Sequence, residues 1–151
     1  MAASIPLASV DLSGNERTYA IQALDAGELT HRGPFVRRLE AAFSDHVGMP
    51  SLCCSSGTAA LHLALLSLGV GHRDEVVIPA LCFGTLASAI LAVGAIPKIV
   101  DVDPKTWGLP RAVMPHYLNR RTKAVVPVHL YGEDAGDFRG MGVPVIEDAC
   151  E

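Results

Sequence analysis

The chain has 151 residues, half of them hydrophobic, and its 16 acidic and 12 basic residues give a formal net charge of −4. This length favours a single domain with a sizeable core. The charges are interspersed and no basic patch contains aromatic residues, which argues against nucleic-acid binding. No pair of the four cysteines has metal-ligand spacing, so we predict no metal site and reduced thiols in a cytoplasmic protein. Residues 1–6 lack the features of a secretory signal.

Two helices are predicted in the first fifty residues. Residues 16–26 carry apolar side chains near helical spacing. A second helix is expected to begin at Pro34, which suits a first helical turn, and to end at Gly48. We therefore expect residues 1–50 to form an N-terminal helical segment, and residues 51–151 to form a separate α/β region.

From residue 52 onward the pattern changes to short apolar strands that alternate with helices. The predicted strands are residues 52–54, 75–78, 97–102, 124–128 and 143–146, and the predicted helices are residues 58–68, 86–93 and 111–118, the last weakened by Pro115. This alternation predicts an α/β fold with a mostly parallel sheet. The strands are continuous apolar runs, as expected when both faces of the sheet are covered.

The span between Glu75 and Lys98 contains no charged residue and is long enough to raise the question of a transmembrane helix. Pro79 ends a short β-branched run, and Gly84 and Gly94 interrupt the remainder. The span therefore favours a strand, a helix and another strand, and we expect no membrane segment.

The turn Ser56-Gly57-Thr58 lies directly before an apolar helical run. Backbone N–H groups, a threonine hydroxyl and the helix dipole would suit a phosphate there, although a simple helix N-cap is the alternative. Ligands of such sheets lie beyond the carboxyl ends of the strands, so Asp148, which follows a predicted strand, could face the same crevice. Neither dinucleotide nor P-loop glycine motifs are present, and a phosphate seat with a carboxylate suits pyridoxal 5'-phosphate (PLP) better.

An ordered series of segments resembles the N-terminal part of the DegT/DnrJ/EryC1/StrS family of PLP-dependent sugar aminotransferases. The segments are Gly33-Pro34-Phe35-Val36, Ser56-Gly57-Thr58-Ala59-Ala60-Leu61, Gly69-Val70-Gly71, Asp74-Glu75-Val76, Pro79 with Phe83, Asp101-Val102-Asp103, Pro127-Val128-His129-Leu130-Tyr131-Gly132 and Val145-Ile146-Glu147-Asp148-Ala149. The resemblance implies the large domain of PLP-transferase fold type I, a three-layer α/β/α structure, here only in part and without the small C-terminal domain. It also implies amino transfer from glutamate or glutamine to a nucleotide-linked keto-sugar.

The resemblance implies cofactor-binding roles at five positions. Gly57 and Thr58 would bind the phosphate, and Phe83 would stack on the pyridine ring. Asp148 would pair with the pyridinium nitrogen, and Glu151 would lie near the 3-oxygen of the ring. Taken alone, Phe83 favours a core residue, and Asp148 could equally be a solvated strand end.

The lysine that links covalently to the cofactor in the family lies beyond the matching segments. Lys98, Lys105 and Lys123 lack its surrounding motif, so we assign no catalytic residue and expect a truncated aminotransferase that is inactive alone. His129 is expected to be structural or to support the site without touching its ligand. The alternatives are a non-catalytic PLP- or phosphate-binding protein, a split-enzyme subunit and an unrelated phosphate-binding module. An uncovered sheet edge and apolar faces favour a homodimer or a complementing chain.

Overall fold

The computed structural model of the chain describes residues 9–27 and 29–151, so the expectation for residues 1–6 lies outside the described part. The chain divides into two compact units, Met1–Cys53 and Cys54–Glu151. The described residues contain no helix with the length and apolar character needed to cross a membrane. They also contain no group of three or more His, Cys, Asp or Glu side chains placed to hold a metal ion.

The first unit holds two helices, α1 (Glu16–Asp25) and α2 (Pro34–Val47), close to the predicted bounds. Helix α2 begins at Pro34 as expected, and it ends at Gly48, whose left-handed φ of 70° a glycine adopts freely. The strand predicted at residues 52–54 is wrong, because these residues have no strand partner. The Cys53 N–H instead donates to the Glu40 carboxylate at 2.9 Å.

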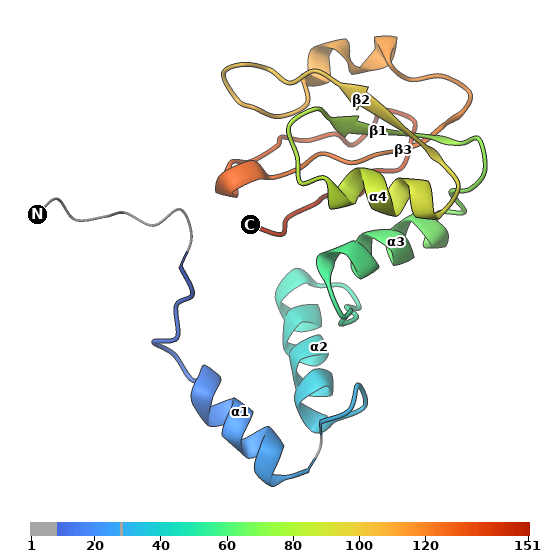
Figure 1. Cartoon of the computed structure of the whole chain (residues 1–151). Coiled ribbons are helices and arrows are strands. Elements are labelled where there is room, and N and C mark those ends of the chain that lie inside the picture. Colours follow the sequence, from blue (N-terminus) through green and yellow to red (C-terminus); the bar gives the residue numbers. More distant parts are fainter. Residues whose placement is uncertain (1–8, 28) are drawn as a thin grey trace, which may run out of the picture. The chain divides into compact units, whose positions relative to one another are not determined.

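The second unit contains a small sheet with helices between its strands (Figure 1). In chain order, its elements are α3 (Gly57–Ser67), β1 (Glu75–Pro79), α4 (Thr85–Ala92), β2 (Ile96–Val100), the 3₁₀ helix η1 (Arg111–His116), β3 (Thr122–Val125) and the 3₁₀ helix η2 (Leu130–Gly132). The strand order is β2-β1-β3, and both pairings are parallel. The predicted α/β fold with a parallel sheet is confirmed.

Both faces of the sheet are covered, as the apolar strands predicted. On one face, α3 and α4 pack through Leu65, Leu86 and Ile90 against Val76 and Ile78 of β1. The second face carries a separate cluster of buried residues: Val77, Val100, Leu109, Met114, Val125 and Phe138. Successive residues of β1 thus alternate between two cores, as the pleat of a strand requires.

The covering of the second face differs from the prediction. In place of an α-helix at residues 111–118, the structure has the 3₁₀ helix η1, drawn in light orange in Figure 1. Pro115 lies inside this element and cannot supply the N–H that an α-helix would need at that position. The layer on this face is therefore built from a short 3₁₀ helix and loops.

The strand predicted at residues 143–146 is also wrong. This segment runs parallel to β3, but it makes only two isolated bridges, Val125 with Val145 and Val128 with Asp148. The physical reason is proline, because Pro127 and Pro144 lack the N–H groups that would complete a ladder. Even so, the segment delivers Asp148 to the carboxyl end of the sheet.

Candidate functional site

The first turn of α3 leaves two backbone donors free. Ser56 is extended, and its hydroxyl accepts the N–H of Ala59 at 3.2 Å. The Ser56 carbonyl accepts the N–H of Ala60 at 3.0 Å. Within the part of the chain that the structure describes, the N–H groups of Gly57 and Thr58 have no acceptor. The Ser56 cap is therefore compatible with the predicted anion seat, because the N–H groups of the next two residues stay available.

Gly57 lies against the C-terminal segment of the chain. A Cβ added at this position would come within 3.0 Å of the Cys150 sulfur, closer than side chains normally pack. The absence of a side chain thus lets the start of α3 approach the segment that carries Asp148. This close approach brings together two regions about ninety residues apart in the sequence.

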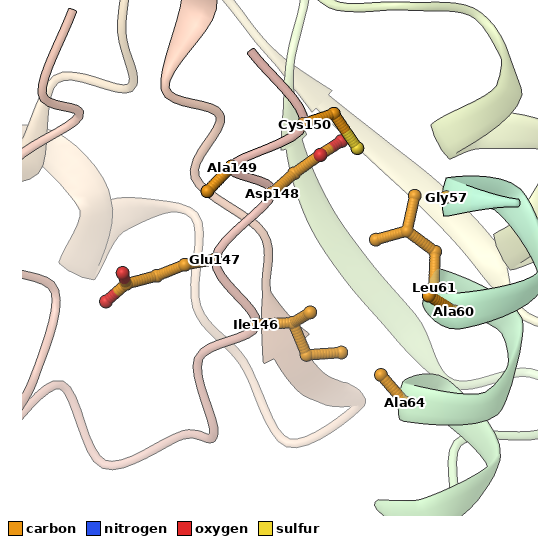
Figure 2. Close-up of a pocket in the computed structure, with 9 residues that line it drawn as sticks. All are labelled: Gly57, Ala60, Leu61, Ala64, Ile146, Glu147, Asp148, Ala149 and Cys150. Atoms are coloured by element: carbon orange, nitrogen blue, oxygen red, sulfur yellow. The ribbon is translucent and has the colours of Figure 1, made fainter. Parts of the chain in front are cut away.

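Asp148 is held in place through its backbone. Its N–H donates to the carbonyl of Pro127, and its carbonyl accepts the N–H of His129, both at 3.0 Å. Figure 2 shows the Asp148 carboxylate beside the Cys150 sulfur, whereas the side chain of Glu147 points the opposite way. The hydrogen bond with Asp148, together with burial and nearby negative charge, raises the pKa of the Cys150 thiol.

A cavity of about 240 Å³ brings all five predicted cofactor residues together. Its lining consists of Gly57, Thr58, Leu61, Phe83, Thr85, Asp148, Cys150 and Glu151. Phe83 is 77% exposed, so the alternative of a core residue is wrong. A second cavity of about 290 Å³ adjoins the first along α3 and is drawn in Figure 2.

Two polar lining residues were not predicted. Thr85 is the first residue of α4, so the site lies at the start of two helices, each with a Gly-Thr pair: Gly57-Thr58 and Gly84-Thr85. The repeated Gly-Thr pair could have identified Thr85 from the sequence. No sequence pattern identifies Cys150, because its thiol reaches the cavity only through the packing of the C-terminal segment on Gly57.

His129 and Glu151 differ in their relation to the cavity. The His129 ring accepts the N–H of Ala135 at Nδ1 and lies 3.4 Å from the Glu147 carboxylate at Nε2. Neither His129 nor Glu147 lines the cavity of about 240 Å³. Glu151 lines the cavity, and its carboxylate accepts the N–H of Tyr131. These contacts fit a structural role for His129 and place Glu151 at the rim.

None of the cavity's lining residues within residues 9–27 and 29–151 is a lysine. Lys98 pairs with Glu75 at the opposite end of the sheet, at 3.3 Å. Lys105 lies beside a different cavity, and Lys123 is exposed on β3. The site therefore offers binding groups, with no amine to attack a bound carbonyl.

The donor set fits a small ring that carries an anion at one end and a protonated nitrogen at the other. The free N–H groups of Gly57 and Thr58 suit a phosphate. No cationic side chain among the described residues pairs with Asp148, so its carboxylate can accept from a positively charged N–H. Phe83 exposes an aromatic face, which suits stacking on a flat ring. PLP has these three features.

Comparison with known proteins gives a consistent result. A sequence profile of the DegT/DnrJ/EryC1/StrS aminotransferase family matches residues 10–151. GDP-perosamine synthase from Caulobacter vibrioides is 40% identical over 97% of this chain, which spans only 42% of that protein's length. The PLP-form of the putative sugar aminotransferase Spr1654 from Streptococcus pneumoniae has a TM-score of 0.77 at 34% identity, over 85% of this chain and 33% of its own.

A third similar protein has a GDP-linked sugar in its name. E. coli GDP-4-keto-6-deoxy-D-mannose-3-dehydratase, solved with bound hydrated PLP, has a TM-score of 0.86 at 26% identity. The match covers 98% of this chain and 41% of that structure. The chain thus corresponds to less than half the length of these relatives.

Proposed function

Because the chain belongs to the DegT/DnrJ/EryC1/StrS aminotransferase family, we propose that it forms the cofactor-binding part of a PLP-dependent sugar aminotransferase. The substrate would be a nucleotide-linked keto-sugar and the amino donor glutamate or glutamine. One observation carries the proposal: Gly57, Thr58 and Asp148, distant in the sequence, line a single cavity of about 240 Å³.

Five of the residues that line the cavity have a defined task in this proposal. The N–H groups of Gly57 and Thr58, with the Thr58 hydroxyl, bind the phosphate. Asp148 holds a proton on the pyridine nitrogen, and Phe83 fixes the plane of the ring. When bound, PLP supplies an electron-withdrawing ring for amino-group chemistry. Glu151 lies at the rim, where it can contact the 3-oxygen of the ring.

The covalent step needs a lysine that lies outside the cavity described. We assign it to a polypeptide segment other than those carrying Lys98, Lys105 and Lys123, supplied by the same protein or by a second chain. The 151-residue chain alone then binds PLP reversibly without transferring an amino group. The alternative, a non-catalytic PLP- or phosphate-binding protein, has the same binding site but needs no such partner.

The first experiment measures PLP binding by equilibrium dialysis. Removing a charge-assisted contact in Thr58→Ala is expected to weaken binding about tenfold, and pyridoxal, which lacks the phosphate, should bind at least as poorly. Thr18→Ala, an exposed helical threonine in the first unit, is the matched control and should bind normally. Equal affinities for PLP and pyridoxal would contradict the phosphate seat.

The second experiment separates enzyme from binding protein. The chain is mixed with glutamate and a GDP-linked 4-keto-sugar, with and without a chain corresponding to the remainder of a full-length relative. Amino transfer that appears only in the mixture supports the enzyme. PLP binding without transfer in any mixture favours the non-catalytic alternative.

An exposed apolar stripe in the first unit supports the proposal of a homodimer or a complementing chain. Leu39, Phe43 and Val47 are exposed and lie at intervals of four residues on α2, so they form one apolar stripe. We assign this stripe to contact with a second copy or a complementing chain. Light scattering after size exclusion tests it: the chain should be larger than 15.9 kDa, and Phe43→Glu should reduce it to a monomer.

A further inference from the structure

We propose that a third cavity, the aromatic notch, binds the guanine base of a GDP-linked substrate. The notch is lined by Lys105, Thr106, Trp107, Leu130, Tyr131 and Glu133 and has a volume of about 280 Å³. The inference rests on the proposed function, since it names the nucleotide for the substrate of the neighbouring cofactor cavity.

The notch lies at the end of the sheet where ligands of parallel α/β folds bind. Trp107 is in the loop that follows β2, and Tyr131 is in η2, which follows β3. Asp103 orders the first loop, because its carboxylate accepts the N–H of Lys105 at 2.7 Å and its carbonyl accepts the N–H of Trp107 at 2.7 Å. The notch is therefore a formed feature of this edge.

A direct hydrogen bond connects the notch to the cofactor cavity. The Tyr131 N–H donates to the carboxylate of Glu151, and Glu151 lines the cavity with Gly57 and Asp148. A ligand that placed its sugar near the cofactor could therefore extend its nucleotide along this rim. The two cavities share the same carboxyl edge of the sheet.

The backbone at both aromatic residues is unfavourable. Trp107 has a φ of 57° and Tyr131 a φ of 55°, and they are two of the three non-glycine residues in the described chain with positive φ. Bulky side chains rarely adopt this region. The strained backbone does not bury either side chain fully, because Trp107 is 51% and Tyr131 69% exposed. Strained, exposed rings of this kind are typical of ligand clamps.

The geometry of the rings suits a flat heteroaromatic ligand. Their centroids are 6.1 Å apart, and the planes meet at 81°, so one ring can stack on a base while the other contacts its edge. Stacking on aromatic side chains accepts any base. The ring pair alone thus defines a base site without choosing among bases.

The charged residues of the notch select guanine. Lys105 can donate to the O6 and N7 acceptors of guanine, and Glu133 can accept from the N1–H and N2 amino donors on another edge. Adenine carries an amino group where guanine has O6, and it has no N1–H. Uracil lacks the amino group and the five-membered ring. One cation and one carboxylate therefore complement guanine better than these other bases.

Trp107 makes the notch directly observable, because it is the only tryptophan in the chain. We would titrate the 151-residue chain with GDP, UDP and ADP and follow tryptophan fluorescence, with free N-acetyltryptophanamide correcting for absorption by the nucleotide. GDP should change the signal saturably and bind at least about tenfold more tightly than UDP or ADP. No saturable change, or equal affinities for the three nucleotides, would overturn the proposal.

Variants identify the groups responsible. Tyr131→Ala should weaken GDP binding about tenfold, while Tyr131→Phe should keep it because the stacking face remains. Glu133→Gln should reduce the preference for GDP over ADP. Tyr19→Ala and Glu16→Gln, exposed residues of α1, are the matched controls. Circular dichroism establishes that each variant is folded, and GDP binding unaffected by both Tyr131→Ala and Glu133→Gln would overturn the assignment.

The outcome of the GDP titration can be distinguished from the outcome of the PLP-binding experiment. GDP binding at Trp107 in a chain that fails to bind PLP would support the notch and contradict the cofactor site. PLP binding with no GDP response at Trp107 would support the cofactor site and overturn the notch.

Discussion

The two ends of the small sheet each carry a carboxylate, and the fold treats them in opposite ways. At the amino end, Glu75 is only 5% exposed and is fully engaged. Its carboxylate accepts from Asn119 Nδ2 at 2.7 Å and from Lys98 Nζ at 3.3 Å, and it also pairs with Arg121. These partners belong to β2 and to the segment entering β3, so Glu75 ties the three strands together.

At the carboxyl end, the fold positions the backbone of Asp148 but leaves its charge uncompensated. Asp148 has no ion-pair partner among the described residues, and a thiol is its side-chain neighbour. A carboxylate neutralised by protein cations stabilises the fold, whereas a fixed carboxylate without a cation is available to a charged ligand. The contrast distinguishes a structural acid from a binding acid.

The largest expected effect comes from breaking the amino-end cluster. Glu75→Ala removes a buried acceptor and leaves Lys98, Asn119 and Arg121 without their shared partner. We expect a loss of about 2 to 3 kcal/mol in the free energy of unfolding, measured by urea denaturation. Glu147→Ala, an exposed carboxylate beside the site, should change it by less than about 0.5 kcal/mol. Equal losses in the two variants would remove the distinction between the ends.

The opposite pattern is expected at the carboxyl end. Asp148→Asn keeps the side-chain shape and removes the charge, so it should weaken PLP binding by about tenfold to a hundredfold in equilibrium dialysis. Its urea midpoint should stay close to that of the wild type, since no protein cation loses a partner. Glu147→Gln, whose side chain points away, is the neighbouring control and should bind PLP normally. A large drop in stability with normal PLP binding would make Asp148 a structural acid.

The predicted and observed elements show which features local sequence patterns can predict. The helix starts at Pro34 and Ser56 depend on local chemistry, as do the strands around residues 76 and 98, and the structure places them close to the predicted bounds. The prediction of a strand at residues 143–146 was wrong because the neighbouring segment contains Pro127, which has no N–H to donate. Which N–H groups face which carbonyls depends on tertiary structure and cannot be read from the local sequence. The prediction of a strand at residues 52–54 was wrong for a related reason. The Cys53 N–H donates to the side chain of Glu40 on α2 and not to a neighbouring strand.

The residues of the candidate site could be predicted from two sources, local helix chemistry and the family resemblance. The Gly57-Thr58 turn followed from helix physics, whereas Phe83 and Glu151 came from the family resemblance. Their lining of one cavity with Asp148 agrees with that resemblance, while their role in cofactor binding stays a prediction. The short distance between Gly57 and Cys150 depends on tertiary packing, and no spacing rule in the sequence encodes it.

A smaller effect should appear when pH is lowered. The hydrogen bond from Asn119, assisted by Lys98 and Arg121, holds the pKa of Glu75 below its ordinary value of 4.5 despite burial. A depressed carboxyl pKa stabilises the fold above the unfolded-state value and loses that contribution as pH falls through the folded-state value. The difference in urea midpoint between the wild type and Glu75→Gln should therefore be full at pH 7 and shrink below about pH 4.5. A difference independent of pH would show that charge is not the source.

The smallest expected effect tests directly whether Asp148 is charged and uncompensated. The Asp148 carboxylate raises the pKa of the Cys150 thiol, first through a hydrogen bond and also through its charge. Asp148→Asn should lower that pKa and speed alkylation of Cys150 by iodoacetamide at pH 8 several-fold, because the thiolate is the reactive form. Peptide mass spectrometry follows Cys150 separately from the three other cysteines. Glu75→Gln, at the far end of the sheet, should leave the rate unchanged, and an equal rate in Asp148→Asn would mean that a cation already neutralises Asp148.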